Sequence, residues 1–182
     1  MPIQIGRAPD HSFEQPLGLL SDCHRRIEHF LKILVRVDAD LSGGPLTDDY
    51  RRALDAALRY FETAAPRHTA DEEDSLFPRL RASDDPAAQQ ALALVDRLEH
   101  DHQAADVHHA AANTLVRRWL DDNRLVPADA AALRDHLAAL QTLYAGHIAV
   151  EDHELFPAAA RLLDAPALQQ IGREMAARRG LR

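Results

Sequence analysis

Two phrases of the sequence repeat the same chemically useful pattern. Each begins with a histidine, has an acidic residue four positions later and ends in Leu-Phe-Pro; they run from His68 to Pro78 and from His147 to Pro157. On a helix, residues four apart share one face, with their Cβ atoms roughly 5–6 Å apart. Each phrase therefore directs an imidazole and a carboxylate toward one point. This donor pair suits a divalent transition metal, with iron, zinc and copper all candidates.

The His-x-x-x-acid spacing recurs along the chain. With 11 histidines and 29 acidic residues among 182, chance alone gives roughly two pairs at a fixed spacing. The chain has four, which are His24/Glu28, His68/Glu72, His102/Asp106 and His147/Glu151. The first two histidines are 44 residues apart and the last two are 45 apart. This near-equal spacing indicates a duplicated helical hairpin, in which each half supplies two histidines.

Four long helices are expected to position these pairs, one pair in each helix. Apolar residues recur at helical spacing over about residues 17–41, 48–78, 86–120 and 127–157. Pro66 should kink or break the second of these helices. The predicted fold is all-α: an N-terminal arm over residues 1–14, an up-down-up-down four-helix bundle over 15–163, and a short C-terminal helix within 164–182.

In each predicted helix the histidine stands where the apolar stripe requires an inward-facing residue. All four imidazoles should therefore point into the bundle. The duplication predicts two metal ions, with Glu72 and Glu151, one carboxylate from each half, bridging them. Two imidazoles, one oxygen from each glutamate and a bridging oxide or hydroxide make five bonds to each ion; zinc prefers four ligands. Iron prefers six, so we expect two iron ions, oxo- or hydroxo-bridged, each with an open position.

At these residues the chain resembles the hemerythrin-like (HHE, cation-binding) domains over about residues 15–160. The matching phrases are Asp22-Cys23-His24-Arg25-Arg26-Ile27-Glu28, His68-x-x-x-Glu72 with Leu76-Phe77-Pro78, Glu99-His100-Asp101-His102, and His147-x-x-x-Glu151 with Leu155-Phe156-Pro157. The resemblance implies a four-helix bundle with a non-haem di-iron centre. It also implies that His24, His68, His102 and His147 are terminal ligands and that Glu72 and Glu151 bridge the irons.

The sequence departs from the oxygen-carrying members of that family in two places. Their fifth histidine, one turn after the first in the third helix, is replaced here by Asp106. Their last carboxylate follows its histidine by five residues, whereas here Glu151 follows by four and Asp152 by five. A fifth position lies about 140° around an ideal helix and would need a bulge to reach the metal. We therefore assign Glu151 rather than Asp152, and Glu72 rather than Glu73.

Several neighbouring side chains have supporting roles or none. Glu28 and Asp106 either accept hydrogen bonds from the ligand imidazoles or reach solvent or pair with an arginine. The first role is favoured for Asp106, which could instead bind metal directly, and Glu28 is left open between the two. Tyr144 either lines the open site or packs in the core. His109 shares the face of His102, but seven residues give roughly 10 Å of rise, so a position at the edge of the core is favoured over a fifth ligand. The side chains assigned to the surface are His29, His108, His136 and His153, with His100 pointing away from the site.

Composition limits the classes of function. The net charge of −8 disfavours a nucleic-acid partner, and the arginines near the C-terminus (Arg173, Arg178, Arg179 and Arg182) are interpreted as a solvated helix end. No 18-residue apolar stretch is present, so no membrane span is expected. Cys23 is the only cysteine, which suits a reducing compartment, and a cytoplasmic location is predicted.

Three classes of function fit these features. The first is a protein that binds or reacts with a small diatomic ligand or peroxide (oxygen, nitric oxide or peroxide) in sensing, storage or stress response. The second is a di-iron redox enzyme, either an oxidase or peroxidase or a nitric-oxide-linked iron–sulfur repair protein, served by an electron-donor protein. The third is a bundle with a structural metal. Loss of the fifth histidine disfavours reversible oxygen carriage, and the sequence does not set the oligomeric state.

Overall fold

A computed structural model describes residues 9–86 and 88–181. Within these residues the chain forms helices and no strands, so the all-α class is confirmed. The elements in order are α1 (Pro16–Leu41), α2 (Asp48–Thr63), α3 (Ala65–Asp71), the π-helical turn η1 (Glu72–Leu76), α4 (Phe77–Arg81), α5 (Ala88–Asp122), α6 (Pro127–Val150), the π-helical turn η2 (Glu151–Leu155), α7 (Phe156–Leu162) and α8 (Ala165–Arg178). Of the predicted arm, residues 1–8 lie outside the described part.

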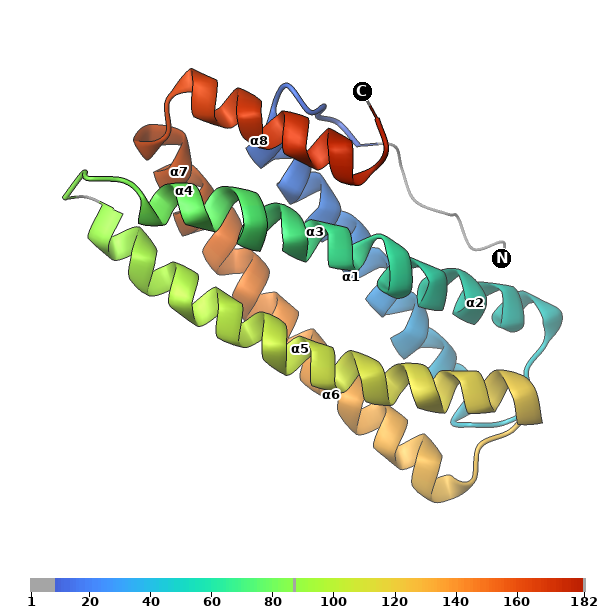
Figure 1. Ribbon diagram of the computed structural model, residues 1–182. Helices are drawn as coiled ribbons and strands as arrows, with labels where there is room; N and C mark the ends of the chain where they lie inside the picture. The colour runs from blue at the N-terminus through green and yellow to red at the C-terminus, as the bar shows by residue number, and fades with distance from the viewer. Residues whose placement is uncertain (1–8, 87, 182) are drawn as a thin grey trace.

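Consecutive elements join into four long helical runs that lie side by side (Figure 1). These runs are α1, the series α2 to α4, α5, and the series α6 to α7. α1 packs against α2 and α6, and α5 packs against the same two helices. The closing helix α8 covers α1, α3 and η1. No helix in the described part of the chain is both long enough and apolar enough to cross a bilayer.

Local sequence signals explain where the runs begin and break. The Thr47 side chain accepts a hydrogen bond from the Tyr50 backbone N–H at the start of α2, and Asp164 caps α8 in the same way. The expected break near Pro66 falls between Thr63 and Ala65. Proline has no backbone N–H to donate, so the helix restarts there with Pro66 in its first turn.

The buried apolar side chains form two clusters with a polar layer between them. One cluster includes Ile27, Ala105 and Leu140, and the other includes Leu20 and Leu98. In sequence, His24 of α1 lies between Leu20 and Ile27, and His102 of α5 lies between Leu98 and Ala105. The apolar stripes of the helices are thus interrupted at a common level, which is where the metal centre was expected.

The C-terminal arginines correct one expectation. Arg173 is exposed, as expected, but Arg178 and Arg179 are only partly exposed, because both pair with the fully buried carboxylate of Asp71 on α3, at 3.0 and 2.7 Å. A buried carboxylate without a partner is costly, and two guanidinium groups offset that cost. These pairs attach α8 to the helix that carries His68. Arg182 lies outside the described residues.

Candidate metal centre

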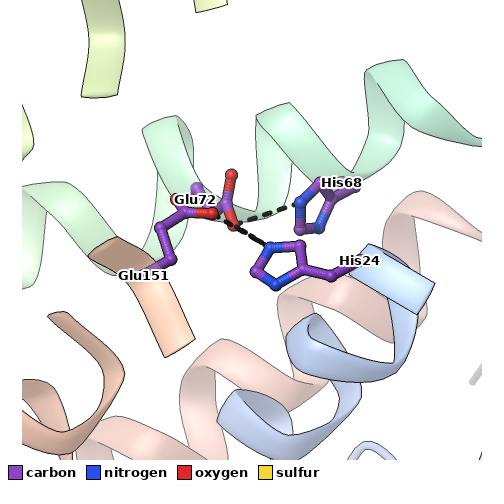
Figure 2. A group of neighbouring side chains, drawn as sticks. All are labelled: His24, His68, Glu72 and Glu151. Atoms are coloured by element: carbon purple, nitrogen blue, oxygen red, sulfur yellow. Dashed lines mark ion pairs between the residues drawn. The ribbon is translucent and has the colours of Figure 1, made fainter. Parts of the chain in front are cut away.

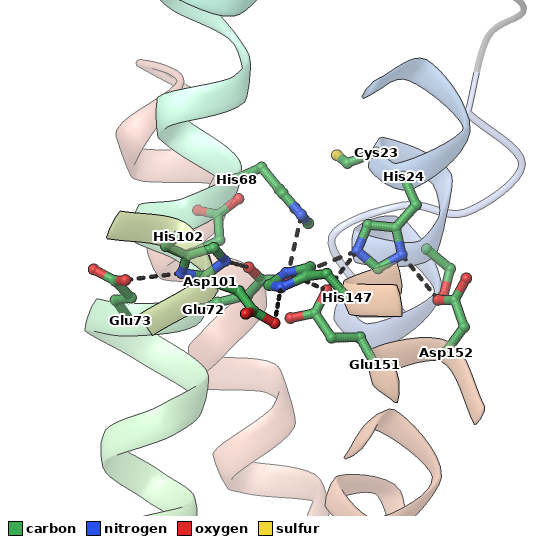
Figure 3. Close-up of polar contacts among 12 residues, drawn as sticks. Cys23, His24, His68, Glu72, Glu73, Asp101, His102, His147, Glu151 and Asp152 are labelled. Atoms are coloured by element: carbon green, nitrogen blue, oxygen red, sulfur yellow. Dashed lines mark hydrogen bonds and ion pairs between the residues drawn. The ribbon is translucent and has the colours of Figure 1, made fainter. Parts of the chain in front are cut away.

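The six expected metal-binding side chains meet inside the helical runs (Figure 3). Each comes from a different element: His24 from α1, His68 from α3, Glu72 from η1, His102 from α5, His147 from α6 and Glu151 from η2. All six are buried, with exposed fractions from 0% for the two glutamates to 8% for His102.

The six residues form two overlapping groups of four. One group is His24, His68, Glu72 and Glu151 (Figure 2), and the other is His102, His147, Glu72 and Glu151. Within each group, one donor atom from every residue lies within 4.8 Å of the others. Both glutamates belong to both groups, whereas each histidine belongs to one.

The donor atoms face one another in a consistent way. Glu72 directs Oε1 toward His68 Nε2, at 3.3 Å, and Oε2 toward His102 Nε2, at 3.4 Å. Glu151 Oε2 lies 2.9 Å from His24 Nε2 and 3.1 Å from His147 Nε2. Each glutamate therefore contacts one histidine from each group, and every histidine presents Nε2 to the centre.

The hydrogen-bonding state of these atoms fits a cation. Both oxygens of Glu72, both oxygens of Glu151 and Nε2 of His24 are buried. Among the described residues they have no partner with hydrogen-bond geometry, although some lie close together. A buried polar atom without a partner costs about 1–3 kcal/mol. Four imidazole nitrogens and two carboxylates directed at a common region form a donor set for a transition-metal ion, and such an ion would satisfy these atoms.

Comparison with known proteins agrees with this donor set. Residues 15–159 match the hemerythrin HHE cation binding domain. The chain belongs to this family. It is also similar to an uncharacterized protein of Haemophilus influenzae, with 27% identity over 168 residues and 92% of each chain covered.

In this hemerythrin-like chain both glutamates begin a π-helical turn. The Phe77 N–H donates to the Glu72 carbonyl and the Phe156 N–H to the Glu151 carbonyl, five residues back in each case. The bulge that a fifth-position acid would need is therefore present in both halves. The acids after the glutamates nevertheless turn outward from the centre and contact imidazoles from behind.

Asp152 and Glu73 orient two of the ligand histidines, His24 of α1 and His102 of α5. His24 Nδ1 donates to Asp152 Oδ1 at 3.0 Å, and His102 Nδ1 donates to Glu73 Oε1 at 2.8 Å. The Ser21 hydroxyl also donates to Asp152, at 2.7 Å. A carboxylate on the outer nitrogen fixes the ring orientation and makes the inner nitrogen a better donor to metal.

Glu28 takes the surface alternative, and Asp106 does not take the supporting role favoured for it. Glu28 pairs with Lys32 at 3.0 Å on the surface, because a long acid one turn before a lysine reaches solvent with it. Asp106 is exposed and lines a small cavity beside the centre, without a contact to a ligand imidazole. The acids that do contact imidazoles come from neighbouring helical runs. The signal that could have found them is the doubled acid, Glu72-Glu73 and Glu151-Asp152, at the same place in both phrases.

Burial and nearby charges shift the pKa values of the side chains at the centre in different directions. Burial lowers the pKa of His24, but the adjacent carboxylates of Asp152 and Glu151 outweigh it and raise that pKa to about 10. Burial and the nearby carboxylate of Glu151 raise the pKa of Glu72 well above its usual range. The pKa of Glu151 is instead lowered, because His147 and His24 outweigh the effect of burial. The nearby histidines thus favour the ionised form of Glu151 but do not offset the effect of burial on Glu72. A metal cation would supply the positive charge that Glu72 lacks.

A cavity of about 20 Å³ adjoins the four histidines. Its other lining residues are Ile27, Ala65, Thr69, Ala105, Asp106, Tyr144 and Ile148. This volume is enough for about one water molecule. Tyr144 lines the cavity, while its hydroxyl shares a hydrogen bond of 2.8 Å with His109 Nε2. His109 also packs on the Phe61 ring at 4.5 Å, so it lies at the edge of the core, as expected.

The remaining histidines contribute no donor to the centre. His100 and His153 are exposed, as expected. His29, His108 and His136 are half-buried rather than fully on the surface, and the last two contact each other through their Nδ1 atoms at 3.0 Å.

Proposed function

We propose that the chain is a non-haem di-iron protein that binds or reacts with oxygen, nitric oxide or peroxide, in sensing, storage or stress response. The observation that carries the proposal is the sharing of Glu72 and Glu151 between two pairs of buried histidines. Two ions bridged by two carboxylates explain this pattern, whereas a single ion leaves one histidine pair without a role. The proposal includes an up-down-up-down topology for the four helical runs, with α8 as an added helix.

The ligand count supports iron. Each ion would receive two imidazoles and one oxygen from each glutamate, together with an oxide or hydroxide. Zinc in a closed structural site is satisfied by four ligands, while iron keeps a position for an incoming molecule. When bound, the two irons would supply the electrons for redox chemistry.

The residues around the cavity would select the incoming molecule. The cavity is small and its walls include Ile27, Ala65 and Ala105, so it suits a molecule of one or two non-hydrogen atoms and excludes larger substrates. With the Tyr144 hydroxyl occupied by His109, the wall offers few polar groups to the ligand. Asp106 stands where a fifth histidine would complete one ion in the oxygen carriers, and it leaves that position open.

One observation favours redox turnover as a second candidate function. Asp106 both lines the cavity and reaches solvent, so its carboxylate can pass protons between the two. Proton supply is required when oxygen or peroxide is reduced, but not when a ligand is held and released.

Mixing anaerobic ferrous protein with oxygen separates these functions. A visible charge-transfer band that disappears when oxygen is removed supports reversible binding. Irreversible consumption of oxygen or peroxide, with an electron donor present, supports a redox enzyme. A protein that holds metal but gives neither response would overturn both and leave a structural role for the metal.

A further inference from the structure

A second cavity, of about 480 Å³, lies between the arm, α1, the junction of α2 and α3, and α8. We call this cavity the arginine pocket. Six of its lining residues define it: Phe13, Cys23, Arg26, Tyr60, Arg67 and Arg179. It is separate from the metal centre. Cys23 immediately precedes His24 in α1, and adjacent helical residues point about 100° apart, so the two sites use neighbouring faces of the helix.

The arginine pocket carries positive charge that other residues do not neutralise. Arg26 and Arg67 are both exposed, and in the described ranges, 9–86 and 88–181, no ion pair or hydrogen bond joins either to another residue. The one acid in the lining, Asp22, already accepts hydrogen bonds from the His11 backbone N–H, at 2.7 Å, and from Arg25. Its charge is therefore not available to Arg26.

Aromatic rings hold two of the guanidinium groups in place. The Arg26 guanidinium lies 5.4 Å from the centre of the Tyr60 ring, and that of Arg179 lies 5.7 Å from the Phe13 ring. Arg179 is also bound to Asp71, so Arg26 and Arg67 are the groups with donors to spare. A planar guanidinium fits a carboxylate through two parallel hydrogen bonds, and one already stacked on a ring loses less freedom when it binds.

The rest of the wall combines apolar side chains with the polar residues His11, Ser12 and Asp22. Leu19 and Ala64 line it beside the two rings. Cavities of about 300–1,000 Å³ with apolar walls and a few convergent polar groups are typical of small-molecule sites.

The outer wall is fixed to the body of the protein. The backbone and ring of His11 both bond to Asp22, at 2.7 and 3.1 Å. The Phe13 carbonyl packs so closely on Gly172 of α8 that a Cβ there would lie 1.9 Å from its oxygen. The pocket thus lies between two helical runs, the end of α8 and an attached segment.

We propose that the arginine pocket binds a small organic carboxylate with an apolar body. The carboxylate would bond to Arg26 and Arg67, and the apolar body would lie against Phe13, Leu19 and Tyr60. This site is independent of the metal centre and of the function proposed for it.

Isothermal titration calorimetry of the full chain with 1-naphthoate and with octanoate tests whether the pocket binds a carboxylate that carries an apolar group. Inorganic phosphate and 1-naphthalenemethanol serve as matched probes that lack the apolar body and the charge, respectively. At least one carboxylate should bind in a saturable manner and at least tenfold more tightly than either matched probe. Arg26→Gln and Arg67→Gln should each weaken binding by about tenfold or more, while Arg59→Gln, an exposed arginine outside the pocket, should leave it unchanged.

The Arg26→Gln/Arg67→Gln double variant should lose binding of the carboxylate. The proposal is overturned if neither carboxylate binds, if phosphate or the neutral alcohol binds equally well, or if the double variant binds as the parent does.

Discussion

At each histidine of the metal centre, the inner nitrogen faces a shared carboxylate and the environment of the outer nitrogen differs. The outer nitrogens of His24 and His102 donate to Asp152 and Glu73. Asp101 lies 3.6 Å from the outer nitrogen of His147, beyond normal hydrogen-bond distance, and that of His68 has no hydrogen-bond partner in the part of the chain that the structure describes. The acids behind His24 and His102 should therefore matter more for metal affinity than other acids nearby.

Asp152→Asn and Glu73→Gln should each weaken metal binding by about 10–100-fold, because each removes a charged acceptor from a ligand imidazole. Competition with a coloured chelator measures the change. Glu28→Gln is the matched control, since Glu28 pairs with Lys32 at the surface, and it should leave the affinity as it is. A larger loss in Glu28→Gln than in Asp152→Asn would contradict the assignment.

His68→Ala and Glu151→Ala should lose metal and lower the thermal midpoint. Metal binds the folded chain only, so removing the site removes the stabilisation by binding, about 3 kcal/mol at a metal concentration of 100 Kd. Metal analysis after desalting and thermal unfolding with and without chelator measure both effects. The parent protein with chelator should unfold at a lower temperature, and the variants should no longer respond to chelator. Unchanged metal content in both variants would exclude these residues as ligands.

At the scale of elements, the two π-helical turns decide which acids enter the centre. Each turn holds one more residue than an α-helical turn, so the residue after the glutamate can reach across to a neighbouring run. Asp152 of η2 contacts His24 of α1, and Glu73 of η1 contacts His102 of α5. Each half of the duplicated hairpin thus orients a histidine of the other half.

Helical periodicity predicts the six central residues, but it does not predict that an acid from each half of the chain orients a histidine of the other half. The histidines fall in apolar stripes of period 3.6, which the sequence displays directly, and the structure brings all six side chains together. A π-helical turn leaves no comparable pattern, so the supporting role was considered for Glu28 and Asp106, each one α-helical turn after a histidine, while Glu73 and Asp152 were weighed only as metal ligands. The pairing of Asp71 with arginines about a hundred residues later was missed for a similar reason, because it depends on how α8 folds back.

The contact between the arm and α8 requires a glycine. A Cβ at Gly172 would lie 1.9 Å from the Phe13 carbonyl oxygen, so Gly172→Ala should displace the arm and destabilise the protein by about 1–3 kcal/mol. Urea unfolding measures the loss, and limited proteolysis should show faster cleavage near Phe13. Gly146→Ala is the control, since a Cβ there meets only Arg97, at 3.8 Å, and alanine is the better helix former by about 0.5–1 kcal/mol. Equal stability changes in the two variants would show that the arm does not pack on α8 in this way.

At the scale of the whole molecule, the folded chain holds a polar layer between two apolar clusters, and stability depends on the protonation of groups near that layer. His109 illustrates this dependence. Burial, with a smaller effect of His108, lowers its pKa from 6.5 to about 4. The folded state therefore keeps His109 neutral at pH values where the unfolded chain binds a proton.

The sign of the resulting pH dependence follows from linkage. Below pH 6.5 the unfolded state gains protons that the folded state does not, so His109 lowers the free energy of unfolding as the pH falls toward 4, by at most about 3 kcal/mol. His109→Gln retains a partner for the Tyr144 hydroxyl and removes the titration. Urea unfolding at several pH values, with chelator present throughout, should show a smaller loss between pH 6.5 and 4 in the variant. Identical pH profiles would contradict the assignment of a neutral, buried His109.

The central claim is that two glutamates, each contacting a histidine from both halves of the chain, hold a pair of iron ions. Anaerobic titration of metal-free protein with ferrous iron, followed by measurement of the iron retained per chain, tests it most directly. The predicted result is two iron ions per chain in the parent protein. Retention of a single ion, or of none, would contradict the claim.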